Sequence, residues 1–317
     1  MPDEANGLKG LAMQYQRLLL ARGVTARHAS DTLGRILRVI GAAQLHDASQ
    51  MDETTVLPAV MGRCPGAASA NHDLRACKAF TRWLHRRGVL AADGMAPVKL
   101  FDEELDPRHP RRALSLDEQR RLLAAARAGE VCCGMTGSQR ALLYELALTT
   151  GLRAGELRRL ETSAIRHAGG ATFLSVRATL TKNRKPATQP LPPDTARRLA
   201  EHLAGRQGGL IFAMPHPTRV PTMVRYDLRR AGIPYRDERG YADFHALRHT
   251  YITQVSLSCD EVKVVQLLAR HGTAELTLQK YVHRDTDHLV AAVLKLPRLV
   301  AAGVTETLNP AELARKD

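Results

Sequence analysis

The chain of 317 residues contains 44% hydrophobic side chains, which excludes wholesale disorder and leaves room for one or two domains. It has no run of about 18 or more apolar residues, and its first ten residues, MPDEANGLKG, lack the pattern of a signal peptide, so we expect a cytoplasmic protein without a membrane partner. Five cysteines, two of them adjacent and none in a C-x-x-C spacing, argue against a disulfide framework and a thiolate zinc site.

The formal net charge of +14 favours a polyanionic partner, usually nucleic acid, although a basic surface can also simply be solvated. The charge is uneven along the chain. Residues 1–105 hold 13 Lys and Arg against 11 Asp and Glu, whereas residues 106–317 hold 33 against 21. Most of the excess positive charge therefore lies in the second part of the chain.

The first hundred residues have the apolar spacing of amphipathic helices at residues 8–23, 28–43 and 69–88. In the third helix one face is expected to be buried. The other faces carry basic residues, including Lys78 and Arg82, which either contact a phosphate backbone or face solvent. We therefore predict an all-α N-terminal domain over residues 1–105.

A charged linker with Pro107 and Pro110 follows, and proline resists helix continuation. Ser115 and Glu118 then have the spacing of a capping box, which indicates the start of a helix. We place the domain boundary in this linker and predict a second domain over residues 106–317.

The second domain is predicted to be mainly α with a small antiparallel β-sheet, an α+β fold. One helix leads to Gly151, and ATFLSV at residues 171–176 is expected to form a strand. Residues 177–192 are expected to form two more strands around a polar turn at residues 183–185. Helices dominate after that, including residues 260–271 and 285–296.

Several charged residues in this domain are candidates for chemistry. Arg153 follows a Thr-Thr-Gly turn at a helix start, a plausible phosphate site, and Glu156 is spaced to reach back to it. An ordinary structural ion pair would show the same pattern. Lys182 lies beside Arg184 and Lys185 at a predicted hairpin tip, which either is solvated or enters a DNA groove.

The stretch FHALRHTYIT places His245 and Arg248 on one helix face, with His249 one turn after His245. Two histidines at i and i+4 could bind a metal ion. Position 246 is alanine rather than an acid, however, and Arg248 would place a positive charge beside the ion. Arginine is well suited to phosphate, so an anion site is favoured over a metal site.

The sequence continues with His271, 23 residues after Arg248, and Tyr281, ten residues after His271. The order Arg, Lys, His-x-x-Arg, His, Tyr with this spacing resembles the tyrosine recombinase (phage integrase) family over about residues 110–295. One departure is the sequence LAR before His271, where family members often have LLG, so that Arg270 is unusual.

The resemblance implies roles for these residues. Tyr281 would attack a DNA phosphodiester, giving a 3′-phosphotyrosyl bond and a free 5′-hydroxyl. Arg153 and Arg248 would stabilise the negative charge on the phosphate in the transition state, and Lys182 would protonate the leaving oxygen. His245 and His271 would hydrogen-bond the phosphate, and His245 could also accept the tyrosine proton. Glu156 and His249 would support the site.

The resemblance also implies the assembly. A SAM-like core-DNA-binding domain (1–105) and a catalytic domain (106–317, with a C-terminal helix and tail) would form a clamp around double-stranded DNA with inverted-repeat core sites. Four protomers, each a monomer or dimer when free, would exchange two strands at a time through a Holliday junction, and no metal or other cofactor is expected. The C-terminal helix could pack in cis or on a neighbouring protomer through its apolar residues Leu289, Val290, Val293 and Leu294.

Two other functions are compatible with the sequence. A type IB topoisomerase would use a similar residue set to nick and reseal DNA. A catalytically silent DNA-binding protein would act as a regulator or accessory factor. The sequence is compatible with integration, excision or dimer resolution as the biological outcome.

Overall fold

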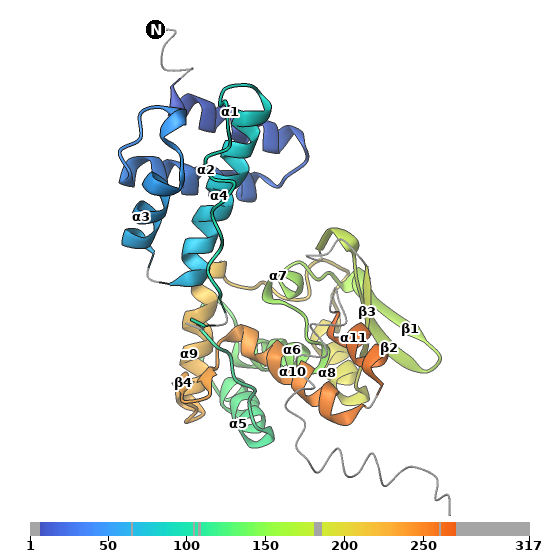
Figure 1. The fold of residues 1–317 in the computed structure, drawn as a ribbon. Helices are drawn as coiled ribbons and strands as arrows, with labels where there is room; N and C mark the ends of the chain where they lie inside the picture. Colours follow the sequence, from blue (N-terminus) through green and yellow to red (C-terminus); the bar gives the residue numbers. More distant parts are fainter. Residues whose placement is uncertain are drawn as a thin grey trace, which may run out of the picture. The chain divides into compact units, whose positions relative to one another are not determined.

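The computed structural model describes residues 7–64, 66–103, 105–106, 109–180, 186–259 and 261–270 (Figure 1). The chain divides into two compact units between Pro110 and Arg111. This division lies in the linker where the sequence places the domain boundary. Within the described ranges, no helix combines the length and the apolar composition needed to cross a bilayer.

The described part of the N-terminal unit is helical, as predicted. Its elements are α1 (Leu8–Ala21), α2 (Ala26–Ala42), the 3-10 helix η1 (Ala48–Gln50), α3 (Glu53–Arg63) and α4 (Ala67–Arg86). The face of α4 expected to be buried is fully buried, at Leu74, Cys77, Phe80, Thr81 and Leu84. The ring of Tyr15 on α1 lies 5.7 Å from that of Phe80, so aromatic packing joins the first and last helices of this unit.

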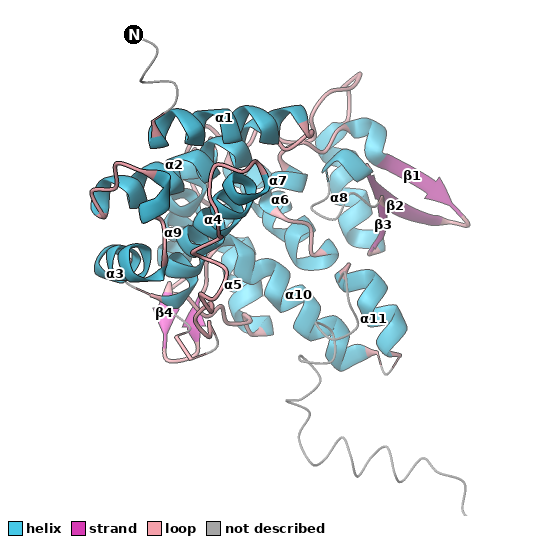
Figure 2. Ribbon diagram, turned by 45° about the horizontal axis from the view of Figure 1, so that its top comes forward, coloured by secondary structure: helices cyan, strands magenta, loops and turns pink. Residues whose placement is uncertain are grey.

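The C-terminal unit combines helices with small antiparallel sheets (Figure 2), which confirms the predicted fold class. Its helices are α5 (Leu116–Arg127), α6 (Gly137–Thr150), α7 (Ala154–Leu157), α8 (Pro193–Leu203), α9 (Val220–Arg230), α10 (Phe244–Ser258) and α11 (Val262–Ala269), with the 3-10 helices η2 (Thr162–Ala164), η3 (Ala178–Leu180) and η4 (Pro217–Arg219). Its strands are β1 (Ile165–Ala168), β2 (Ala171–Val176), β3 (Ala187–Leu191), β4 (Arg236–Asp237) and β5 (Gly240–Tyr241).

The three-stranded sheet has the order β1-β2-β3 with antiparallel pairing throughout. Strand β2 is the predicted strand at residues 171–176. The prediction of a new strand directly after it is partly wrong, because Ala178–Leu180 form η3 and β2 itself pairs with β3. The predicted turn at residues 183–185 lies outside the described residues.

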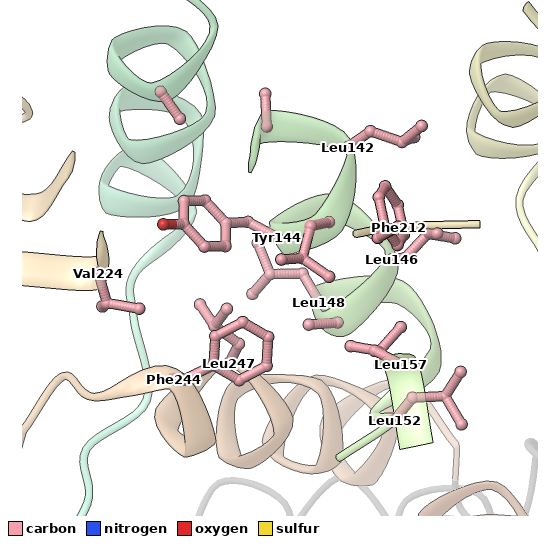
Figure 3. Close-up of a cluster of buried hydrophobic side chains, with 14 of the residues drawn as sticks. Leu142, Tyr144, Leu146, Leu148, Leu152, Leu157, Phe212, Val224, Phe244 and Leu247 are labelled. Atoms are coloured by element: carbon pink, nitrogen blue, oxygen red, sulfur yellow. The ribbon is translucent and has the colours of Figure 1, made fainter. Parts of the chain in front are cut away.

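Helix α6 is the centre of the C-terminal core (Figure 3). It packs against α5, α8 and α10, and its side chains are buried on almost every face. Around it lie apolar side chains from several elements, among them Leu157, Phe212, Val224, Phe244 and Leu247. Packing on almost every face fixes the position of α6, and with it the position of Gly151 at the end of the helix. The candidate site begins at this residue.

A buried ion pair also joins α6 to α9. The guanidinium of Arg140 donates to both carboxylate oxygens of Asp227, at 2.8 and 3.0 Å, and the Tyr144 hydroxyl donates to the same carboxylate at 2.7 Å. Neither Arg140 nor Asp227 is exposed.

An exposed turn lies between α6 and α9 in the sequence, directly after α8. Its residues Gly205, Gly208 and Gly209 have positive φ.

Candidate active site

The site begins where α6 ends. Gly151 adopts the left-handed conformation (φ 62°), and Arg153 is the residue that precedes the first turn of α7. The carboxylate of Glu156 accepts hydrogen bonds from the backbone N–H of Arg153 at 2.8 Å and from its Nη1 at 3.2 Å. The Glu156 side chain is 3% exposed and that of Arg153 is 35% exposed, so the guanidinium is tethered on one side and open to solvent on the other.

Arg248 lies on α10, whose first turn is capped by Asp243 accepting from the N–H of Ala246. Its buried guanidinium donates to the backbone carbonyls of Gly151 and Ala269. Burial, followed by the charges of Arg153 and Arg270, lowers the pKa of Arg248 to about 9, which still leaves it charged at neutral pH. Because these two acceptors are neutral carbonyls, the positive charge of Arg248 is held in place without being cancelled by them.

His245 lies one turn before Arg248 and is exposed. Desolvation of the ring on its protein side, followed by the charges of Arg111 and Arg248, lowers the pKa of His245 to about 4. Arg111 is itself held by Asp243, with its Nε 3.0 Å from a carboxylate oxygen. At neutral pH the imidazole is therefore uncharged and able to accept a proton.

The second histidine of the motif, His249, differs from His245 in its exposure. His249 lies on α10 and is half-buried. Among the residues that the structure describes, no group of three or more His, Cys, Asp or Glu side chains is arranged to hold a metal ion.

A third arginine, Arg270, lies at the site. The sequence comparison with the family indicated only that an arginine is unusual at this position. Arg270 directly follows α11, and its Nη2 donates to Glu156 Oε2 at 2.8 Å and to the Gly151 carbonyl at 3.2 Å. Arg153 and Arg270 thus both bind the Glu156 carboxylate, and the Arg248 guanidinium shares the Gly151 carbonyl with Arg270. Such an arrangement favours an anionic ligand such as a phosphate.

The described part of the predicted site comes together, since Arg153, Glu156 and Arg248 all meet near Gly151, and the charges of both arginines act on His245. The other members lie outside the described residues. These are Lys182, Arg184, Lys185, His271 and Tyr281, whose roles stay predictions.

The two DNA-contact candidates on α4 differ from each other. Arg82 is exposed. The ammonium group of Lys78 instead donates to three backbone carbonyls, those of Met95 at 2.7 Å, Ala96 at 3.0 Å and Val98 at 2.5 Å. Lys78 thus has a structural role that its sequence position did not reveal, and Arg82 is the better candidate for a phosphate contact.

A family model described as "Phage integrase family" matches residues 112–288, more than half of the chain. The chain is similar to the tyrosine recombinase XerC of Mycobacterium tuberculosis, with 29% identity over 287 residues that cover 85% of this chain and 91% of the relative. It is also similar to XerC of Neisseria gonorrhoeae, with 26% identity over 251 residues and 77% of each chain covered.

Solved structures share the fold. A lambda integrase dimer bound to a COC′ core site matches with a TM-score of 0.69 and 19% identity, covering 88% of this chain and 79% of that one. The XerH recombinase bound to a palindromic difH substrate, in a post-cleavage complex, matches with a TM-score of 0.66 and 16% identity, covering 86% and 81%. The chain therefore belongs to the phage integrase family, the tyrosine recombinases, which are DNA breaking and rejoining enzymes.

Proposed function

We propose that this protein is a site-specific DNA recombinase that cleaves and rejoins DNA through a 3′-phosphotyrosyl intermediate on Tyr281. The observation that carries the proposal is the convergence of Arg153 and Arg248 beside Gly151, with the charge of Arg248 anchored on neutral carbonyls. Negative charge builds on the non-bridging oxygens when a nucleophile attacks a phosphodiester. Fixed guanidiniums stabilise that charge without having to reorganise during the reaction.

The remaining steps need one base and one acid. His245, uncharged at neutral pH, accepts the proton of the attacking tyrosine or hydrogen-bonds the phosphate together with His271. Lys182 protonates the leaving 5′-oxygen. The bond between tyrosine and phosphate conserves the energy of the broken phosphodiester, so that religation by a 5′-hydroxyl needs no nucleotide cofactor.

The proposed assembly has residues 1–105 as a core-DNA-binding domain and residues 106–317 as the catalytic domain. Both domains grip one half-site of an inverted repeat on cytoplasmic DNA. Four protomers form the synapse and exchange two strands at a time through a Holliday junction. This stoichiometry has support from a fold neighbour, a lambda integrase tetramer bound to a Holliday junction, which matches with a TM-score of 0.68.

Covalent trapping tests the function without knowledge of the target. The full chain is incubated with nicked suicide duplexes whose half-sites are randomised, and covalent complexes are isolated on denaturing gels and sequenced. We expect a protein–DNA adduct that disappears in Tyr281→Phe and falls by about 10²–10³-fold in Arg248→Ala. Tyr226→Phe, which removes a hydroxyl from a half-buried tyrosine on α9, is the matched control and should retain the adduct.

The two rival functions give different results in this assay. A topoisomerase would relax any supercoiled plasmid, and the trapped duplexes would share no half-site sequence. An accessory protein would bind a defined sequence tightly yet leave no covalent adduct in the unmodified chain, which would refute the proposal.

A further inference from the structure

Arg270 occupies a backbone conformation that is unfavourable for a side chain. It ends α11 with φ 53° and ψ 42°, in the left-handed region. Glycine is the usual residue at such a helix end because it has no Cβ to clash. Among the described residues, Gln44 and Cys133 are the other non-glycine residues with positive φ. An arginine in this place therefore calls for a compensating interaction.

The compensating interaction is a buried ion pair. Arg270 Nη2 lies 2.8 Å from Glu156 Oε2, and the two side chains are only 7% and 3% exposed. The same nitrogen donates to the carbonyl of Gly151, which also accepts from Arg248. The Arg270 side chain thus connects the end of α11 to Glu156 on α7 and to the Gly151 carbonyl that also binds Arg248.

Glu156 is consequently shared between two arginines. Its Oε2 accepts from Arg270 and from the backbone N–H of Arg153, while its Oε1 accepts from Arg153 Nη1. Burial acts to raise the pKa of Glu156, but the hydrogen bond and charge of Arg270, ahead of those of Arg153, hold it below its usual range. A buried carboxylate without Arg270 would either bind the guanidinium of Arg153 more completely or take up a proton.

We propose that Arg270 is a positioning residue for the cleavage reaction: by binding Glu156 from the interior, it holds the Glu156 carboxylate where it tethers Arg153, whose exposed side then faces the scissile phosphate. This inference rests on the proposed function. Arg270 also directly precedes His271 in the sequence. Its side chain therefore fixes the backbone one residue before that predicted phosphate contact.

The test compares Arg270→Gly, Arg270→Lys and Glu156→Gln in the full chain, using a nicked duplex recovered from the covalent-trapping assay. Single-turnover cleavage at saturating DNA should fall by about 10- to 100-fold in Arg270→Gly, as expected for a displaced catalytic group. The Kd for DNA should stay close to that of the unmodified chain, because the Arg270 guanidinium is buried against Glu156 and the Gly151 carbonyl.

The pH profile separates positioning from a general loss of structure. The charges that face Glu156 come from Arg153 at the start of α7, Arg248 on α10 and Arg270 after α11. Without Arg270 the pKa of Glu156 rises, so the acid limb of the cleavage rate should move to higher pH. Arg270→Lys restores a buried positive charge and should return this limb toward its original pH with partial recovery of the rate, and it provides a second variant if glycine impairs folding.

Gln44→Gly is the matched control, because Gln44 has the same φ of 53° after a helix in the N-terminal unit. This substitution should relieve the strain of a non-glycine residue in the left-handed backbone conformation without changing the cleavage rate. If Arg270→Gly forms the adduct at the rate of the unmodified chain and its acid limb is unchanged, this inference is overturned but the proposed function is not. The same holds if Arg270→Gly and Glu156→Gln lose activity independently, so that the double variant shows the product of both losses. Absence of any adduct from the unmodified chain would overturn the proposed function and the inference with it.

Discussion

His245 and Arg248 lie one helical turn apart, and their surroundings give them different charge states at neutral pH, neutral for His245 and positive for Arg248. Desolvation and nearby cations keep the His245 imidazole neutral, whereas Arg248, with a pKa of about 9, stays charged. Two titratable groups separated in this way can divide the work of a reaction, one binding negative charge and the other moving a proton. These states could not be assigned from the sequence of the motif, because they arise from burial in the folded chain and from charges on other segments, at Arg111 and Arg153.

The lowered pKa of His245 predicts a pH-dependent stability. Between its ordinary pKa of about 6.5 and the folded value of about 4, the unfolded chain binds a proton that the folded chain does not. The free energy of unfolding should therefore decrease as the pH falls through this window. In His245→Gln the decrease should be smaller, measured by urea unfolding at pH 7, 6 and 5, with His167→Gln on β1 as the matched control. An identical pH dependence in His245→Gln and the unmodified chain would contradict the assignment.

At the residue scale, local spacing predicted some of the site and missed contacts between distant segments. The i, i+3 spacing of Arg153 and Glu156 predicted their ion pair, which the structure confirms. The interaction of Glu156 with Arg270 joins positions 114 residues apart, and nothing in either local sequence indicates it. The same limit applies to Lys78, whose helical position suggests a surface cation but whose acceptors come from the loop at residues 95–98.

At the scale of elements, the end of α6 predicts a graded effect of two glycine substitutions. A Cβ at Gly151 would lie 2.4 Å from Cδ1 of the buried Tyr251 ring, whereas one at Gly169 would meet nothing within 4 Å, and both glycines have positive φ. Gly169→Ala should therefore cost about 1 kcal/mol from the backbone conformation alone. Gly151→Ala should cost about 2–5 kcal/mol because overpacking is added.

Urea unfolding followed by far-UV circular dichroism measures this difference. Trp83, the sole tryptophan, lies in the N-terminal unit, so its fluorescence reports separately on the unit that neither substitution touches. Equal losses of stability in the two variants would show that the Tyr251 ring can move aside.

The elements with strong periodicity or caps were predictable, and the short or interrupted ones were not. The capping box of Ser115 and Glu118 starts α5 as expected, and Gly151 ends α6. Helix α3 was not predicted, since Pro58 lies inside it and its first turn contains two β-branched threonines. Strand β1 was missed for another reason, because it has only four residues and three of them are exposed, so that no alternation of burial appears.

At the scale of the whole molecule, the net charge of +14 predicts DNA binding that weakens steeply with salt. The slope of log Kd against log salt reports the number of phosphate contacts, at about 0.9 per contact. Arg82→Ala should reduce this slope by about 1, because its exposed guanidinium is proposed to meet a phosphate. Lys78→Met should leave the slope unchanged, because the Lys78 ammonium group donates hydrogen bonds to three backbone carbonyls and not to a phosphate. Loss of these hydrogen bonds should lower the stability of the N-terminal unit. A reduced slope in Lys78→Met would reverse this assignment.

The buried pair of Arg140 and Asp227 has a consequence for the connectivity of the enzyme. The exposed turn at Gly205–Gly209 lies between the two partners in the chain, and exposed turns of this kind tolerate a break in the backbone. A break there would leave Arg140 and Arg153 on one fragment and Asp227 and Arg248 on the other. Each fragment alone would carry an uncompensated buried charge and one of the two arginines, Arg153 or Arg248, proposed to bind the phosphate. Reassembly would restore the ion pair and the arginine pair together. The turn is therefore a suitable place to divide the protein into two inactive fragments that would regain the proposed recombinase activity only when they associate.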